Sequence, residues 1–142
     1  MTRSGNLLKF VTEHIFLVAL AAVSGTMLVW PTIRRSTAGP SISTLQATLL
    51  INQQNALVLD VREAAEYEGG HVLNSRHLAI GELDARSSEL ERYKARPVIV
   101  VCESGNRSDK AVATLRKQGF GQVFSLSGGI GAWKQAGLPL EK

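Results

Sequence analysis

The chain has 142 residues, of which 44% are hydrophobic and 20% charged; this accommodates one compact domain with an additional segment and excludes a multidomain enzyme. Its positive charge lies at the front, because residues 1–40 hold four basic residues against one acidic, whereas residues 41–142 hold twelve against eleven. Since the larger part is nearly neutral and only 6% of the chain is aromatic, we expect no nucleic-acid partner.

An uncharged segment lies near the start of the chain, from Ile15 to Ile33. Its 19 residues would form about 28 Å of helix, which is close to the hydrocarbon thickness of a bilayer. Lys9 precedes it and Arg34-Arg35 follows it, with Trp30 near the far end. These flanks are typical of an anchor. We therefore predict an N-terminal membrane anchor over residues 1–35, with one transmembrane helix over about 15–33.

Two other interpretations of this segment stay open, namely a buried helix and a cleaved signal peptide. Ser36-Thr37-Ala38 resembles a cleavage site, but Pro31, where the helix is expected to end, and two arginines intervene, and the apolar run is long for a signal peptide. Two basic residues lie on each side of the segment. We expect a single-pass protein of the bacterial inner membrane with its domain facing the cytoplasm.

A small, polar linker is predicted over residues 36–42, followed by a domain over residues 43–142. Ser43 or Thr44 is a suitable cap for a helix that runs through Leu50. Further helices are expected over Leu83–Tyr93, Arg107–Gln118 and Ile130–Gln135.

Three short apolar runs alternate with these helices. They are rich in β-branched residues and lack alternation, as strands covered on both faces do. The runs are Leu57–Leu59, Val98–Val101 and Val123–Leu126. The alternating order predicts an α/β fold, an open parallel sheet flanked by helices, with functional groups at the carboxyl ends of the strands.

Cys102 is the single cysteine, which excludes an intramolecular disulfide and a multi-cysteine metal site; we expect no metal ion and no cofactor. It directly follows a predicted strand, and Glu103, Ser104, Gly105, Asn106 and Arg107 then lead into a helix. Backbone N–H groups and the dipole at a helix N-terminus favour the thiolate, and an arginine there can hold an anionic oxygen group. We interpret Cys102 as a nucleophile rather than a buried structural cysteine.

Four segments of the chain resemble, in order and spacing, the motifs of the single-domain rhodaneses, the sulfurtransferase family. The resemblance covers about residues 43–140. The segments are Leu59–Arg62, Glu66–Val72, Cys102–Ser108, and Gly128–Trp133 with Gly137–Pro139. This resemblance implies a rhodanese-like fold.

The resemblance also implies a chemistry for Cys102, which would take a sulfane sulfur from a donor such as thiosulfate and pass the persulfide sulfur to cyanide or a thiol. The backbone N–H groups of Glu103 to Arg107 would stabilise the thiolate and the persulfide, and Arg107 would orient an anionic donor. The implied partners are a small-molecule sulfur donor, a thiol or cyanide acceptor, and an acceptor thiol on another protein.

Two competing functions remain open. A non-catalytic rhodanese-like binding or regulatory module would not need Cys102. A phosphatase or arsenate reductase would need a wider loop: phosphatases related to this fold place five residues between cysteine and arginine, whereas four separate Cys102 from Arg107.

Four further residues are expected to support the cysteine loop. Asp60 is predicted to bond loop backbone or pair with an arginine, because a carboxylate beside the sulfur would disfavour its ionisation. Arg62 is expected to be exposed or ion-paired rather than to take part in the chemistry. His71 is not expected to act as a general base, since a thiolate formed at a helix N-terminus needs none. Ser108 completes this supporting set.

Overall fold

The computed structural model describes residues 3–37 and 39–142, with side chains over residues 5–31 and 39–142. The chain divides into two compact units, Met1–Thr37 and Ala38–Lys142. Each unit is treated by itself below.

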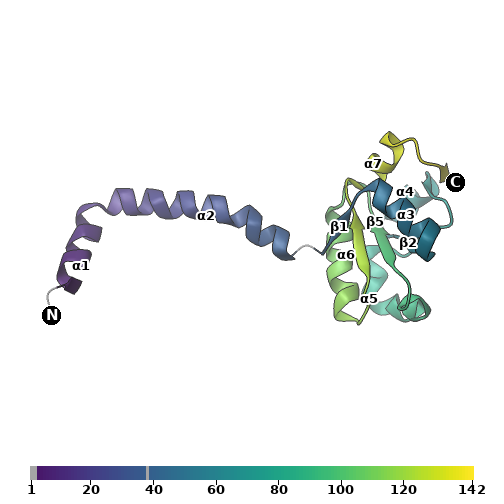
Figure 1. Ribbon diagram of the computed structural model, residues 1–142, viewed down its shortest axis with the longest axis horizontal. Coiled ribbons are helices and arrows are strands. Elements are labelled where there is room, and N and C mark those ends of the chain that lie inside the picture. The colour runs from purple at the N-terminus through teal and green to yellow at the C-terminus, as the bar shows by residue number, and fades with distance from the viewer. Residues whose placement is uncertain (1–2, 38) are drawn as a thin grey trace. The chain divides into compact units, whose positions relative to one another are not determined.

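The first unit consists of two helices, α1 (Arg3–Glu13) and α2 (Ile15–Thr37), which meet at a sharp bend (Figure 1). Within the described residues, no single helix is long and apolar enough to cross a membrane. Gly5–Glu13 and Ile15–Pro31 meet that test only as a pair bent by 85°. The expectation of one transmembrane helix over about 15–33 is therefore not supported by the structure.

The position of Pro31 also differs from the expectation, because α2 continues past it to Thr37. A proline removes one backbone donor, but its fixed φ is compatible with a helix, so it does not have to end one.

The second unit contains a five-stranded parallel sheet in the order β1-β6-β5-β2-β4. Its strands are β1 (Ser41–Ile42), β2 (Leu57–Asp60), β4 (Arg76–His77), β5 (Val98–Val101) and β6 (Val123–Leu126). A separate antiparallel pair joins β3 (His71–Val72) to β7 (Leu140–Glu141). The three predicted strands are confirmed, and they form the buried centre of the parallel sheet.

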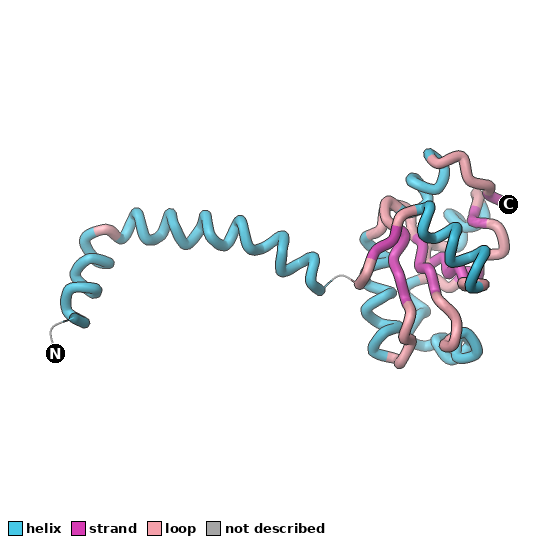
Figure 2. The backbone as a smooth tube through the Cα atoms, in the orientation of Figure 1, coloured by secondary structure: helices cyan, strands magenta, loops and turns pink. Residues whose placement is uncertain are grey.

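Helices cover both faces of this sheet, and Figure 2 shows the strands lying between them. They are α3 (Thr44–Gln54), α4 (Ala64–Glu68), α5 (Leu83–Arg86), α6 (Asn106–Lys117), α7 (Gly129–Gln135), and the 3₁₀ helices η1 (Ile80–Glu82) and η2 (Ser87–Tyr93). Alternate strand residues point to opposite faces. Val98 and Val100 therefore pack with α5, η2 and α6, whereas Ile99 and Val101 pack with α3 and α7.

Two sequence expectations about these elements need correction. The predicted linker over 36–42 contains β1, whose residues pair with Ser125 and Leu126 of β6, because this short segment completes the edge of the sheet. The helix expected over Leu83–Tyr93 is one α-helical turn followed by the 3₁₀ helix η2. Ser87 lies at the change, and its hydroxyl donates to the Asp84 carbonyl, a local bond that competes with a continuous α-helix.

The helix starts and ends were predicted more closely. Ser43 caps α3, and its side chain and that of Gln46 bond reciprocally to backbone N–H groups. In α6, Val112 and Leu115 are buried. These local signals position α6, whose N-terminus adjoins the cysteine.

Candidate active site

Cys102 lies one residue beyond the carboxyl end of β5, the middle strand of the sheet, and is 1% exposed. Gly105 caps α6 with a φ of 110°, a left-handed conformation that glycine adopts without the steric cost of a Cβ. This turn brings the chain from the strand end into the helix over three residues. The sulfur is thereby held at the N-terminal end of α6.

The sulfur has two polar neighbours. The backbone N–H of Gly105 donates to Cys102 Sγ at 2.9 Å, and the Ser108 hydroxyl oxygen lies 3.5 Å from Sγ. An N–H donor and a helix N-terminus both stabilise a sulfur anion. Of the residues expected to surround the substrate, Glu103, Ser104 and Asn106 are exposed.

Ser125 extends this polar contact into the core. The Ser108 hydroxyl donates to the Gly105 carbonyl at 2.8 Å and lies 2.7 Å from the Ser125 hydroxyl. Both serines are buried, with Ser125 at 1% exposure. Sequence reasoning missed Ser125; the available signal was a serine inside the otherwise apolar strand β6.

The start of α7 packs against the other side of the cysteine loop. The Ile130 N–H donates to the Cys102 carbonyl at 2.9 Å. Gly129 has a φ of 57°, and a Cβ at this position would overlap the carbonyl oxygens of Cys102 and Glu103. A glycine is therefore required for α7 to approach the loop this closely.

Arg107 does not stand free over the loop. Its guanidinium donates to both carboxylate oxygens of Glu66 at 2.7 Å, and the two side chains are about one-third exposed. Hydrogen bonding by Arg107 lowers the pKa of Glu66 to about 2, while the same contact raises the pKa of Arg107 above its usual value. The charge of Arg107 is therefore already paired, which argues against its expected role of orienting an anionic donor.

Glu66 also belongs to the helix that presents it. It lies in the first turn of α4 and accepts the Glu63 backbone N–H at 2.9 Å. This capping contact holds the carboxylate in place for Arg107. The sequence analysis included Glu66 only within a motif and did not identify it as a site residue.

Asp60 and Arg62 form a buried pair beside the loop. Arg62 donates to Asp60 through Nε and Nη2, to the Gly70 carbonyl at 2.8 Å, and to Glu103 at 3.5 Å. Asp60 also accepts the Arg62 backbone N–H. Burial lowers the pKa of Arg62, but the hydrogen bonds and charge of Asp60 outweigh burial and raise it. The expected pairing of Asp60 with an arginine is thus present, and the pair ties the end of β2 to the segment before β3.

His71 is directed at other groups than the sulfur. Its Nδ1 lies 2.9 Å from the Tyr67 carbonyl, its ring stacks on the Tyr67 ring at 3.8 Å, and its Nε2 lies 3.5 Å from Glu141. One ring nitrogen therefore faces α4 and the other faces β7. This arrangement supports the chain around α4 and gives no geometry for a general base.

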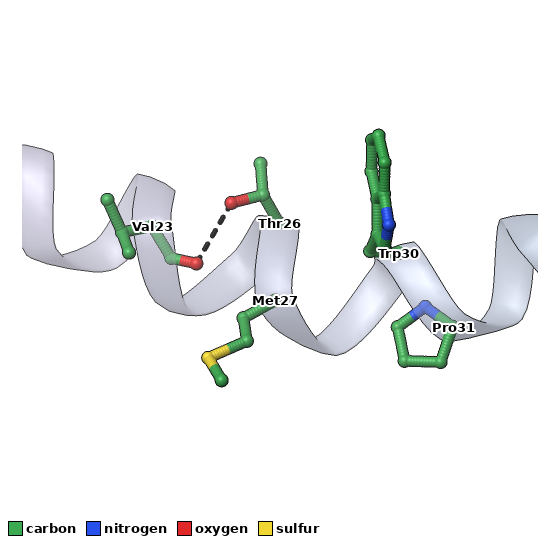
Figure 3. Close-up of a pocket in the computed structure, with 5 residues that line it drawn as sticks. All are labelled: Val23, Thr26, Met27, Trp30 and Pro31. Carbon is green, nitrogen blue, oxygen red and sulfur yellow. Dashed lines mark hydrogen bonds between the residues drawn. The ribbon is translucent and has the colours of Figure 1, made fainter.

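Two other kinds of site were considered. The hollow drawn in Figure 3 is lined by Val23, Thr26, Met27, Trp30 and Pro31, all on α2, and none of these side chains is titratable. Within the described part of the chain, no group of three or more His, Cys, Asp or Glu side chains is arranged to hold a metal ion. The chemistry-bearing side chains gather around Cys102.

Comparison with known proteins gives matches that cover most of the chain. Residues 43–136 match the family model described as a rhodanese-like domain. The chain is 36% identical over 137 residues to the uncharacterized protein YibN of Escherichia coli K12, covering 94% of this chain and 95% of that protein.

Two further similarities concern the second unit. The thiosulfate sulfurtransferase GlpE of Coxiella burnetii is 37% identical over 93 residues, covering 66% of this chain and 85% of GlpE. A crystal structure of a rhodanese-related protein from Thermoplasma volcanium superposes with a TM-score of 0.63 at 35% identity, covering 72% of this chain and 98% of that one.

Proposed function

Because the chain belongs to the rhodanese-like domain family, we propose that it is a sulfurtransferase of the thiosulfate:cyanide type, which works through a persulfide on Cys102. The observation that carries this proposal is the environment of the Cys102 sulfur. Cys102 Sγ accepts the Gly105 N–H at 2.9 Å at the N-terminus of α6, an arrangement that favours an anionic sulfur. The similarity to a thiosulfate sulfurtransferase supports the reaction class.

The first step is attack by the Cys102 thiolate on the sulfane sulfur of the donor. With thiosulfate, the new S–S bond forms as the donor's S–S bond breaks, and sulfite leaves with the electron pair. The persulfide on Cys102 retains the negative charge of the former thiolate. The Gly105 N–H contacts Sγ and stabilises the thiolate, whereas the charge of the persulfide lies mainly on its outer sulfur, which the other backbone N–H groups of the loop would stabilise.

In the second step the acceptor, cyanide or a thiolate, attacks the outer sulfur. The bond between Cys102 Sγ and that sulfur breaks, and the electron pair returns to Sγ as thiolate. No external oxidant or reductant is required for either step. The buried pair of Asp60 and Arg62 holds the backbone beside the loop.

Two other functions compete with this one. A non-catalytic binding module would leave Cys102 unmodified by sulfur donors. A phosphatase or arsenate reductase needs a cradle for a larger oxyanion, whereas only four residues separate Cys102 from Arg107, and that arginine is paired with Glu66. The short loop favours sulfur transfer.

Intact-mass analysis of the full chain after exposure to thiosulfate tests the proposal. We expect a gain of about 32 Da, the mass of one sulfur atom, on Cys102 and its loss on addition of cyanide. Cys102→Ser is the control and should neither gain the mass nor transfer sulfur. An active protein that never carries the extra sulfur would overturn the mechanism.

We also propose that residues 1–35 attach the domain to the bacterial inner membrane, with the domain on the cytoplasmic side. Support comes from the uncharged run between Ile15 and Ile33 and from the large apolar side chains that α2 exposes within its own unit, including Phe16 at 87% and Met27 at 77%. The bend between α1 and α2 argues for a broken rather than a straight hydrophobic segment.

A further inference from the structure

Both guanidinium groups near the sulfur are already neutralised by carboxylates. Arg107 is held by Glu66 through two contacts of 2.7 Å. Arg62 is 3% exposed and is held by Asp60 at 2.8 Å. Neither cation is therefore available to balance a second anion without giving up an existing partner.

Glu103 adds negative charge at the mouth of the loop. It directly follows Cys102 in the sequence, and its side chain is 54% exposed. Its nearest cation is Arg62, at 3.5 Å, and Arg62 is shared with Asp60 at a shorter distance. Glu103 therefore exposes its carboxylate to solvent on the residue that directly follows Cys102.

The charged groups that interact with Arg62 and Arg107 are unbalanced. Glu63, Glu66 and Glu103 act electrostatically on Arg107 or Arg62, and Arg107 in turn acts on Cys102. With Asp60, four carboxylates stand against two guanidinium groups. Glu66 stays ionised at neutral pH, since its pKa is about 2. An approaching dianion such as thiosulfate is repelled, whereas a cation is attracted.

We propose that the sulfur partner preferred by this site is a thiol that carries positive charge close to its sulfur. The inference rests on the proposed sulfurtransferase function and specifies its substrate class. Thiosulfate remains a usable but inefficient donor.

The transfer step that carries this preference is balanced. The thiolate of the cationic thiol attacks the outer sulfur of the Cys102 persulfide and forms a new S–S bond. The bond from Cys102 Sγ to that sulfur breaks, and Sγ keeps the electron pair as thiolate. The thiol becomes a persulfide, so the same compound is a donor in the reverse direction.

Three thiols that share a two-carbon backbone provide the test: cysteamine, 2-mercaptoethanol and 2-mercaptoethanesulfonate. The full chain is loaded with excess thiosulfate, freed of it, and mixed with each thiol, and the loss of the added sulfur mass is timed. Rates are corrected for the thiolate fraction of each compound. At low salt we expect cysteamine to react about tenfold faster than the sulfonate, and the ratio to shrink at high salt.

Glu103→Gln should reduce the ratio about threefold, because it removes one charge from the mouth and leaves the contacts of Arg62 with Asp60 and Gly70. Glu91→Gln is the matched control, since Glu91 is exposed on η2 and pairs with Lys94. This control should leave the ratio unchanged.

The outcomes separate the two proposals. If no thiosulfate concentration loads Cys102, the sulfurtransferase function itself is wrong. If Cys102 loads but the three thiols react at equal corrected rates, or the sulfonate reacts faster, the charge preference is wrong and the sulfurtransferase function stands. A cationic preference that Glu103→Gln does not change would also overturn the inference.

Discussion

The Arg107 guanidinium and the Glu66 carboxylate face each other with two parallel contacts of 2.7 Å, although the residues lie 41 positions apart in the sequence. The pair joins the first turn of α6 to the first turn of α4. It therefore clamps the cysteine loop against a helix that follows the neighbouring strand. Such a two-pronged contact holds geometry as well as charge.

Substitution of Arg107 tests whether this clamp shapes the loop. We expect Arg107→Ala to lower the loading rate of Cys102 by about tenfold to a hundredfold for a dianionic and a singly charged donor alike, because the loop loses its support. The comparison uses thiosulfate, a dianion, and the persulfide of 2-mercaptoethanol, which carries a single negative charge when ionised.

Arg107→Lys provides the matched variant, since it keeps the charge but lacks the planar fork that meets both oxygens of Glu66. We expect it to be impaired with both donors as well. If lysine restored thiosulfate use selectively, Arg107 would act by binding the anionic donor and not by shaping the loop.

The same pair makes stability depend on pH. The folded-state pKa of Glu66, about 2, lies below its ordinary value of 4.5, so its contribution is present above about pH 4.5 and is lost as the pH falls towards 2. Because both side chains are about one-third exposed, solvent reduces this contribution to about 1 kcal/mol. Denaturant unfolding of wild type and Glu66→Gln should differ by this amount at pH 7 and converge at about pH 2.

Glu68→Gln is the control, because Glu68 is an exposed carboxylate on the same helix. It should follow the wild-type pH dependence. If the difference in the free energy of unfolding between wild type and Glu66→Gln stayed constant from pH 7 to about pH 2, the contribution of the ion pair would not depend on the ionisation of Glu66.

Ser125→Ala tests the buried hydroxyl pair beneath the sulfur. The variant leaves Ser108 bonded to the Gly105 carbonyl but removes its contact with Ser125, at a cost of about 1 kcal/mol in the free energy of unfolding. Ser108 Oγ, whose own proton goes to the Gly105 carbonyl, then keeps only the Cys102 S–H as a donor, which favours the thiol over the thiolate. We expect the midpoint of the pH–rate profile for Cys102 loading to move to higher pH.

Ser127→Ala, at an exposed position two residues further on, is the matched control and should leave the profile unchanged. A Ser125→Ala protein that is less stable but has the wild-type pH profile would limit Ser125 to packing.

Membrane attachment is tested by fractionation of the full chain from native cells. We expect it to sediment with membranes and to resist extraction by salt and carbonate, because apolar attachment is not screened by ions. The fragment Ala38–Lys142, which is a separate compact unit, should stay in the supernatant. Recovery of a processed protein beginning near Gly39 would indicate a cleaved signal peptide instead.

Much of the second unit follows from local sequence signals. The apolar runs ending at Leu59, Val101 and Leu126 form the central strands, since residues buried on both faces must be apolar throughout. Ser43 and Gly105 mark the starts of α3 and α6, because helix ends need a side-chain partner or a special backbone conformation. The position of Cys102 between a strand and a helix is local in the same sense.

The tertiary structure decided which side chains meet at the loop. Glu66 and Arg107 come together only because β2 and β5 are neighbours in a parallel sheet, which aligns the segments that follow them. Ser125 reaches Ser108 because β6 adjoins β5. These contacts depend on strand order, and strand order arises from packing over the whole domain. A motif read along the chain therefore located the candidate nucleophile, while the charge that surrounds it was set by the fold.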